Sequence, residues 1–315
     1  MGDVVGLGAL NLDLFYEVED LGVLGLQGGR EICCDQRAFD VLLERLRALG
    51  RPVAESPGGS AANTIFALSR LGFKVGFVGK VGRDPEGEFV LKGMQGVDVS
   101  RVKREGRTGL CLVVLDPRRD RALVVKPNAN DTLDYDDLDP TYISGFRLLH
   151  MSSFVGERPF EAQRRLLEEL PKRVRVTLDP GELYARRGIG ALDGILRRCW
   201  TVFLTEGEMR LLTGKDPEGG AKDLMELGVR WVVCKRGPLG ALAFGPGGPF
   251  RLDTSPSSEV VDNTGAGDVF NAGFLAGMLL GMGVEDCLRL GHRLASKSLK
   301  GFGRQSYPAK EDLCA

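Results

Sequence analysis

Strands and helices alternate regularly over the second half of the chain, and this alternation limits the possible folds more than any other feature. Apolar, β-branched runs predict strands at 147–152, 174–179, 201–205 and 230–235, and apolar residues at helical spacing predict helices at 160–170, 191–198, 207–213 and 221–227. Alternating units of this kind form a parallel sheet with helices on both faces, and the binding site lies where the strands end. The sequence therefore predicts an α/β fold with a doubly wound, mostly parallel sheet flanked by helices.

The stretch 262–268 reads Asp-Asn-Thr-Gly-Ala-Gly-Asp and lies between a strand expected at 259–261 and a helix expected at 269–280. Gly265, Ala266 and Gly267 allow a tight turn that directs successive N–H groups to one point at the positive end of the helix, which is an anion site. Asp268 is expected in the first helical turn, facing whatever binds there. An anion site beside a base suits phosphoryl transfer to an alcohol, and the alternative interpretation is a capped helix whose glycines only make a turn.

A second pair of glycines, Gly58 and Gly59, precedes a helix that is expected to begin around Asn63. Glycines at a helix N-terminus let a ligand approach the backbone closely. This motif therefore predicts a second ligand contact.

The N-terminal segment suggests a dinucleotide-binding turn through Gly6 and Gly8, but two observations argue against it. Asn11 occupies the place of the third glycine, and alternating residues at 12–19 predict a strand where that motif needs a helix. A dinucleotide-binding oxidoreductase is therefore disfavoured. Asp13 is then a carboxylate at a strand junction, either a solvated turn residue or an acceptor of hydrogen bonds from hydroxyl groups.

The segments 108–116 and 122–126 are β-branched runs joined by a polar turn, so they predict a β-hairpin. A hairpin inside an alternating chain is a candidate lid. We therefore expect a small β-sheet beside the main sheet.

The composition excludes several classes of partner. Lys and Arg number 42 against 43 Asp and Glu, with no basic run, so nucleic acid and anionic membranes are disfavoured. The longest apolar stretch, 269–284, carries Asn271 and many small residues, which predicts a buried helix and no membrane span. Seven cysteines without C-x-x-C spacing indicate reduced thiols in the cytoplasm and no zinc site. With only two histidines in the chain, the proton chemistry is expected to fall to carboxylates.

The order of these motifs closely resembles the ribokinase-like (PfkB) family of carbohydrate and nucleoside kinases. Residues 58–63 with the glycines of 79–87 are similar to the family's first signature, and 262–268 is similar to its second. The resemblance covers essentially the whole chain. It implies one ribokinase-like kinase domain over 1–315, with lid strands contributed by about 12–34 and 107–127.

The resemblance also implies roles for individual residues. Asp268 takes the proton of the acceptor hydroxyl, and Gly265, Ala266 and Gly267 form the anion hole. The acceptor contacts are Asn11, Asp13, Gly58, Gly59 and Asn63, and the nucleotide contacts are Thr205, Lys235, Gly237, Gly240 and His292. Glu208 matches the acidic end of the family's N-x-x-E magnesium motif and is expected to hold Mg²⁺ through water, although Thr205 stands in place of the Asn. Asp262 and Ser306 fall where some relatives bind a monovalent cation such as K⁺.

The function that this resemblance implies is an ATP-dependent, magnesium-requiring kinase that transfers the γ-phosphoryl group to a primary hydroxyl of a small sugar. The alternative is a nucleoside kinase of the adenosine kinase type, because the long segment between Asp13 and Gly58 is similar to that branch. A binding or regulatory protein without the chemistry is a third interpretation. We also expect a cytoplasmic location and a homodimer formed through the lid, as in dimeric relatives. The acceptor's identity does not follow from sequence spacing, because pocket side chains come from several loops.

Overall fold

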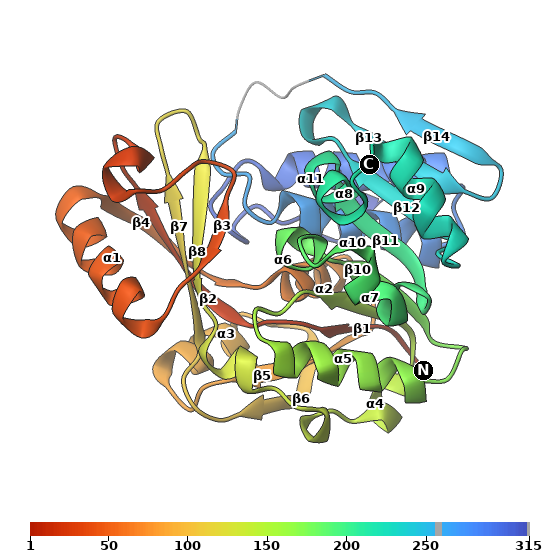
Figure 1. Cartoon of the computed structure of the whole chain (residues 1–315), viewed down its shortest axis with the longest axis horizontal. Helices are drawn as coiled ribbons and strands as arrows, with labels where there is room; N and C mark the ends of the chain where they lie inside the picture. The colour runs from red at the N-terminus through yellow and green to blue at the C-terminus, as the bar shows by residue number, and fades with distance from the viewer. Residues whose placement is uncertain (256–259, 314–315) are drawn as a thin grey trace.

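The computed structural model describes residues 1–255 and 260–313, which form two sheets (Figure 1). The larger sheet has the strand order β14-β13-β12-β11-β10-β9-β1-β5-β6. Its strands are β1 (Gly2–Leu7), β5 (Val75–Val81), β6 (Val97–Arg104), β9 (Phe146–Ser152), β10 (Arg175–Asp179), β11 (Cys199–Thr205), β12 (Trp231–Lys235), β13 (Ala241–Gly245) and β14 (Gly248–Leu252). The run from β12 to β6 is parallel, and β13 and β14 are antiparallel at one edge. This confirms the predicted mostly parallel sheet.

Helices cover both faces of the larger sheet. One face packs against α2 (Ser60–Arg70), α10 (Ala266–Leu279) and α11 (Val284–Ser298), and the other packs against α5 (Glu157–Glu169), α7 (Gly188–Leu196), α8 (Glu206–Thr213) and α9 (Pro217–Glu226). Successive strand residues such as Leu148 and Leu149 belong to opposite cores, as the two-residue period of a strand requires. The sheet is therefore doubly wound. The shorter helices are α3 (Pro85–Lys92), α4 (Pro140–Ser144) and α6 (Gly181–Ala185).

The second sheet is smaller and has the order β3-β8-β7-β2-β4. It comprises β2 (Asn11–Glu17), β3 (Glu31–Cys33), β4 (Arg51–Gly58), β7 (Gly109–Leu115) and β8 (Arg121–Lys126), of which β7 and β8 form the predicted hairpin. Helix α1 (Gln36–Leu49) packs on one face of this sheet through Phe39 and Leu46. Figure 1 shows the small sheet and α1 standing to one side of the larger sheet and its helices.

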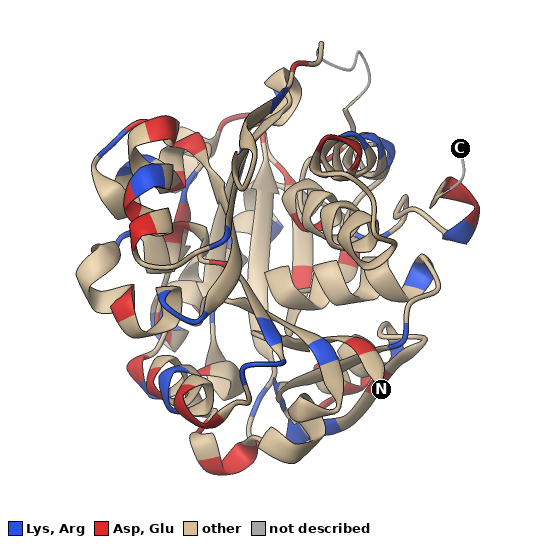
Figure 2. Ribbon diagram, turned by 90° about the vertical axis from the view of Figure 1, so that its right-hand side faces the viewer, with Lys and Arg blue, Asp and Glu red and all other residues tan. Residues whose placement is uncertain are grey.

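The surface carries both signs of charge. Figure 2 shows Lys and Arg interspersed with Asp and Glu over the outer helices and loops, while the central strands are largely uncharged. The apolar helix α10 is buried, as predicted, and Asn271 within it is fully buried. In the part of the chain that the structure describes, no helix has both the length and the hydrophobicity needed to cross a membrane.

The strand expected at 259–261 is not observed. Glu259 lies outside the described residues, and Val260 and Val261 are not in a strand. Val261 donates its N–H to the Leu299 carbonyl at 2.8 Å, so the chain meets the end of α11 here and pairs with no strand. The helix that follows begins at Ala266, three residues before the expected start, so it already includes Asp268.

Candidate active site

A cleft of about 760 Å³ lies between the small sheet and the carboxyl ends of β10, β11 and β12. Most of the predicted site residues line it, namely Asn11, Asp13, Gly59, Asn63, Thr205, Glu208, Lys235, Gly237, Gly240, Gly265, Ala266, Gly267, Asp268 and His292. Gly58, Asp262 and Ser306 are not among its lining residues. Residues from both ends of the chain therefore meet in a single cleft.

Asp268 lies in the first turn of α10 and contacts the start of a second helix. Ser60 Oγ donates to one of its carboxylate oxygens at 2.7 Å, and Asn63 Nδ2 donates to the other at 2.9 Å. Both donors come from the first turn of α2, so two helix N-termini converge on this carboxylate. Burial, and after it the charge of Asp179, raise the pKa of Asp268 to about 6. Its carboxylate is therefore mostly ionised at neutral pH and close to the range that suits a general base.

The turn before α10 needs glycine at Gly265. Its φ is +77°, and a Cβ there would lie 2.2 Å from Tyr307 Oη. Only glycine fits this left-handed position without moving the tyrosine. The backbone N–H groups of Ala266 and Gly267 are the first of the helix and have no partner within it, although the Ala266 N–H donates to the Asn263 carbonyl of the preceding turn at 3.3 Å. The start of α10 suits an anion, and the anion hole itself stays a prediction.

Lys235, at the end of β12, forms a buried ion pair near the start of α10. Its Nζ is 2.6 Å from Asp179 Oδ2, which also accepts from Asn271 Nδ2 at 2.7 Å. Burial opposes the charge on Lys235, but Asp179 and Glu208 outweigh it and raise its pKa. A Cβ at Gly267 would lie 3.3 Å from Nζ, so the ammonium group is close to the helix start. It is thus placed to neutralise charge on an anion bound there.

The predicted acceptor contacts lie at the base of the small sheet. In the antiparallel pair β2–β4, Asn11 is opposite Gly58 and Asp13 is opposite Ser56. Gly59 has a φ of +101°, and a Cβ there would lie 2.0 Å from the Ala9 carbonyl, so this close approach requires glycine. Burial raises the pKa of Asp13 to about 8, with the charge of Arg304 opposing the shift. Asp13 can therefore accept or donate a hydrogen bond near neutral pH.

The predicted nucleotide contacts line the other end of the cleft. Gly237 and Gly240 flank a short turn after β12, and His292 on α11 is half-buried, which lowers its pKa. Thr205 and Glu208 form a capping box: Thr205 Oγ1 accepts from the Glu208 N–H at 3.2 Å, and Glu208 Oε2 accepts from the Thr205 N–H at 2.7 Å. The residue that departs from the family motif therefore has a helix-starting role of its own.

Glu208 fits a magnesium contact that runs through water. One of its carboxylate oxygens accepts from Thr205, and the side chain lines the cleft. Within residues 1–255 and 260–313, no group of three or more His, Cys, Asp or Glu side chains is placed to hold a metal ion directly. Magnesium commonly keeps several of its waters and takes other ligands from substrate phosphates, so a single carboxylate suits it.

Asp262 and Ser306 lie outside the cleft. The two carboxylate oxygens of the buried Asp262 accept from the N–H groups of Thr264 at 2.8 Å and Gly303 at 3.0 Å. The bond from Gly303 joins the loop before α10 to the loop after α11. A monovalent cation at this position stays a prediction.

Several polar residues of the site were missed by the sequence reasoning. Ser60, Asp179 and Asn271 contact the predicted residues directly or through one another. Asn130 holds the Leu10 backbone through both of its amide atoms and donates to Asn11 Oδ1 at 2.8 Å. Arg304 Nε donates to Asn63 Oδ1 at 2.9 Å. Of these residues, only Asp179 had a signal in the sequence: it is a carboxylate at the carboxyl end of a predicted strand, where binding sites of parallel sheets lie.

Comparison with known proteins identifies the family and the fold. Residues 34–311 match the family described as pfkB family carbohydrate kinase. The chain is 37% identical over 254 residues to an uncharacterized sugar kinase of Archaeoglobus fulgidus, covering 78% of this chain and 99% of that protein. It is 32% identical over 256 residues to a cytidine kinase of Thermococcus kodakarensis, covering 78% and 89%. The structure of adenosine kinase from Sinorhizobium meliloti superposes with a TM-score of 0.89 at 22% identity, covering 99% and 98%.

The family match and these kinase relatives identify a phosphotransferase that uses an alcohol group as acceptor. The chain belongs to the pfkB family of carbohydrate kinases.

Proposed function

We propose that this kinase transfers the γ-phosphoryl group of ATP to a primary hydroxyl of a small sugar, with Asp268 as the general base. The observation that carries the proposal is the position of Asp268 in the first turn of α10, held from both sides by Ser60 and Asn63. The Asp268 carboxylate accepts the hydroxyl proton as that oxygen attacks phosphorus. The N–H groups of Ala266 and Gly267 and the Lys235 ammonium group stabilise the charge that spreads over the transferring phosphoryl oxygens.

The donor would lie along the wall that carries Gly237, Gly240 and His292, with its phosphates toward the start of α10. Glu208 would hold Mg²⁺ through one of its waters, and the ion would neutralise negative charge on the phosphates.

Glu208→Gln is expected to raise the magnesium concentration needed for activity more than it lowers the saturated rate. When a carboxylate holds the metal only through water, a higher magnesium concentration can partly offset its loss. Gln keeps a side-chain oxygen that can accept from the Thr205 N–H. The measurement is initial rate against magnesium concentration. Glu206→Gln is the matched control, because Glu206 lies in the same turn, pairs with Arg236 and does not line the cleft. An unchanged magnesium dependence would assign Glu208 a capping role alone.

We also propose that the small sheet, with strands from about 12–34, 107–127 and 51–58, is a lid over the acceptor. The contacts that join it to the main body include two polar ones on the side of β3 and β8: Arg121 Nη1 donates to Asn263 Oδ1 at 2.9 Å, and Arg30 pairs with Glu182 at 3.5 Å. Asn263 belongs to the loop that precedes α10. Closure over the acceptor would therefore exclude water from the reacting phosphoryl group.

Amide exchange in β7 and β8 is expected to slow when acceptor and a nonhydrolysable ATP analogue are added together. Arg121→Gln should reduce this protection because it removes the contact with Asn263. The interior strand β10 serves as an internal reference in the same experiment. Equal exchange in the hairpin with and without ligands would refute the lid.

A homodimer through this sheet is also proposed, and sedimentation showing only monomer would exclude it.

A nucleoside is the alternative acceptor, and a side pocket favours it. This pocket of about 110 Å³ shares Asn11, Glu31 and Gly59 with the main cleft and has apolar walls that include Phe154 and Leu183. Burial, and after it the charge of Glu182, raise the pKa of Glu31 to about 7, so its carboxyl group can donate or accept. A nucleobase needs such an apolar slot with a polar group at its mouth. The cytidine kinase relative agrees with this interpretation.

The function is tested by ADP formation with a panel of pentoses, hexoses, sugar acids and nucleosides. A sugar as the best acceptor by kcat/KM supports the leading proposal, and a nucleoside supports the alternative. No ADP above background with any acceptor would favour a binding protein that has lost the chemistry.

Repeating the best reaction in K⁺ and in tetramethylammonium tests the proposed cation at Asp262 and Ser306.

A further inference from the structure

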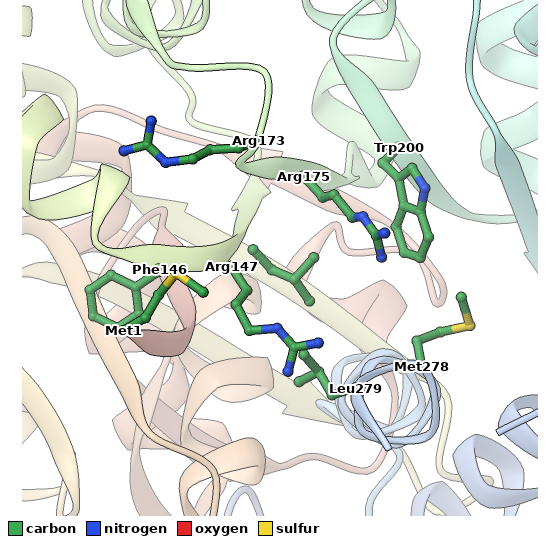
Figure 3. A pocket seen from close by; sticks show the side chains of 9 residues that line it. Met1, Phe146, Arg147, Arg173, Arg175, Trp200, Met278 and Leu279 are labelled. Atoms are coloured by element: carbon green, nitrogen blue, oxygen red, sulfur yellow. The ribbon is translucent and has the colours of Figure 1, made fainter. Parts of the chain in front are cut away.

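A further pocket, of about 230 Å³ and separate from the side pocket described above, lies at the opposite end of the sheet from the cleft (Figure 3). Its lining includes Arg147 at the start of β9, Arg175 at the start of β10, Trp200 at the start of β11 and Met278 in the last turn of α10. The cleft is formed by the other ends of β10, β11 and α10. A helix of this length spans about 20 Å, so the pocket and the cleft do not overlap.

The pocket is rich in positive charge without matching negative charge. Three arginines line it, and no carboxylate does. Arg147 reaches Asp3 only at 3.8 Å, and Asp3 already accepts from the Lys74 N–H. Among the described residues, Arg173 and Arg175 have no carboxylate within 4.0 Å, although Arg173 donates to the Ser144 carbonyl at 3.5 Å. Exposed arginines elsewhere, such as Arg164 and Arg197, are paired at 2.8 Å. Arg175, without a carboxylate partner in the described ranges, and Arg147, with only a long contact to Asp3, are donors suited to a phosphate.

The rest of the lining is flat and apolar. Leu148 is buried and lies opposite Arg175 in the sheet, and Met1, Phe146, Met278 and Leu279 also line the pocket. The Arg175 guanidinium lies over the Trp200 ring at 4.6 Å from its centroid. Figure 3 shows Arg147 and Arg175 extending to the same side, toward α10, while Arg173 extends away from them. Two guanidinium groups thus stand beside an apolar surface and an indole ring.

From this arrangement we propose that the pocket binds a nucleoside monophosphate, with its phosphate on Arg147 and Arg175 and its base against Trp200 and Met278. The charge argues for the phosphate, and the aromatic and thioether surface argues for a flat ring. The site is independent of the cleft, because a ligand here touches neither the acceptor residues nor the helix start at Asp268.

Trp200 provides a local signal, because the chain has only two tryptophans and the other, Trp231, is buried on β12. In a Trp231→Phe background, AMP is expected to change Trp200 fluorescence in a saturable way, while adenosine has a much smaller effect. Removing one guanidinium, in Arg147→Gln or Arg175→Gln, should weaken AMP binding by roughly tenfold, the loss expected for one charge-assisted contact. Arg197→Gln, an exposed arginine paired with Asp193, is the control.

The possible outcomes separate the proposal from its competitors. Arg147→Lys and Arg175→Lys keep the charge, so an intermediate loss supports a phosphate held by planar guanidinium groups. A signal with inorganic phosphate as strong as with AMP would overturn the role of the ring. No signal at millimolar AMP, or a signal that the arginine variants leave unchanged, would overturn the site. The protein could also associate with itself as its concentration rises. If the same arginine variants abolish that association, the ligand site is overturned and this face is a contact between copies of the chain.

Discussion

Asp268→Asn is expected to lower turnover by roughly 10²–10⁴-fold while leaving the fold and nucleotide binding nearly intact, because this is the usual range for losing a positioned general base. Asn is nearly isosteric, and its side-chain oxygen can still accept from Ser60 or Asn63. The N–H groups of Ala266 and Gly267 remain at the anion site. The variant loses only the ability to accept the hydroxyl proton and one negative charge beside the phosphates.

Turnover and the nucleotide dissociation constant are measured together, because the proposal assigns them to different atoms of one motif. Asp286→Asn is the matched control: it removes a carboxylate from the first turn of α11, where Asp286 pairs with Arg289 away from the cleft. Turnover within a few-fold of the unaltered enzyme would exclude Asp268 as the base. A circular dichroism melt separates loss of chemistry from loss of fold.

The pH profile gives the same hypothesis a second readout. The base must be ionised to accept a proton, and its pKa is raised to about 6 by burial and by Asp179. The value of kcat/KM is therefore expected to fall as pH drops through about 6 and to level off above it. In Asp268→Asn this acid limb should disappear from the residual activity.

Short-range signals predicted much of the fold and part of the site. The apolar runs of β9 to β12 are buried on both faces of the sheet, so they are continuous in sequence and easily recognised. The anion turn was recognisable because glycines, a helix start and a carboxylate lie within seven positions. Each of these features is set by neighbouring residues.

Edge strands and long-range pairs were not predictable in this way. β4 contains Pro52 and Pro57, which are tolerated because it lies at the edge of the small sheet, and β6 is rich in charge because it lies at the edge of the larger one. Neither shows a buried strand's pattern. Asp179, Lys235 and Asn271 come from β10, β12 and α10, so only the folded arrangement brings them together.

The buried pair of Lys235 and Asp179 leads to the second large expected effect. Lys235→Met is expected to lower the free energy of unfolding by about 3–5 kcal/mol, the range for removing one partner of a buried ion pair. The two side chains are only 11% and 7% exposed, so water cannot replace the lost partner. Asp179 would retain Asn271 as a donor, but its charge would be uncompensated beside Asp268.

The measurement is urea unfolding of the single variants Asp179→Asn and Lys235→Met and of the double variant that combines them. The double variant carries neither charge, and the amide oxygen introduced by Asp179→Asn can still accept from Asn271, so it should lose less stability than Lys235→Met alone. Lys215→Met is the control, because Lys215 pairs with Asp223 at 2.8 Å but is 53% exposed, and exposed pairs contribute about 0–1 kcal/mol. Losses that simply add in the double variant would mean that the two charges do not stabilise each other. That result would mean that packing, and not the ion pair with Asp179, holds Lys235 in place. The role of its ammonium group would then be only to neutralise charge on the phosphates.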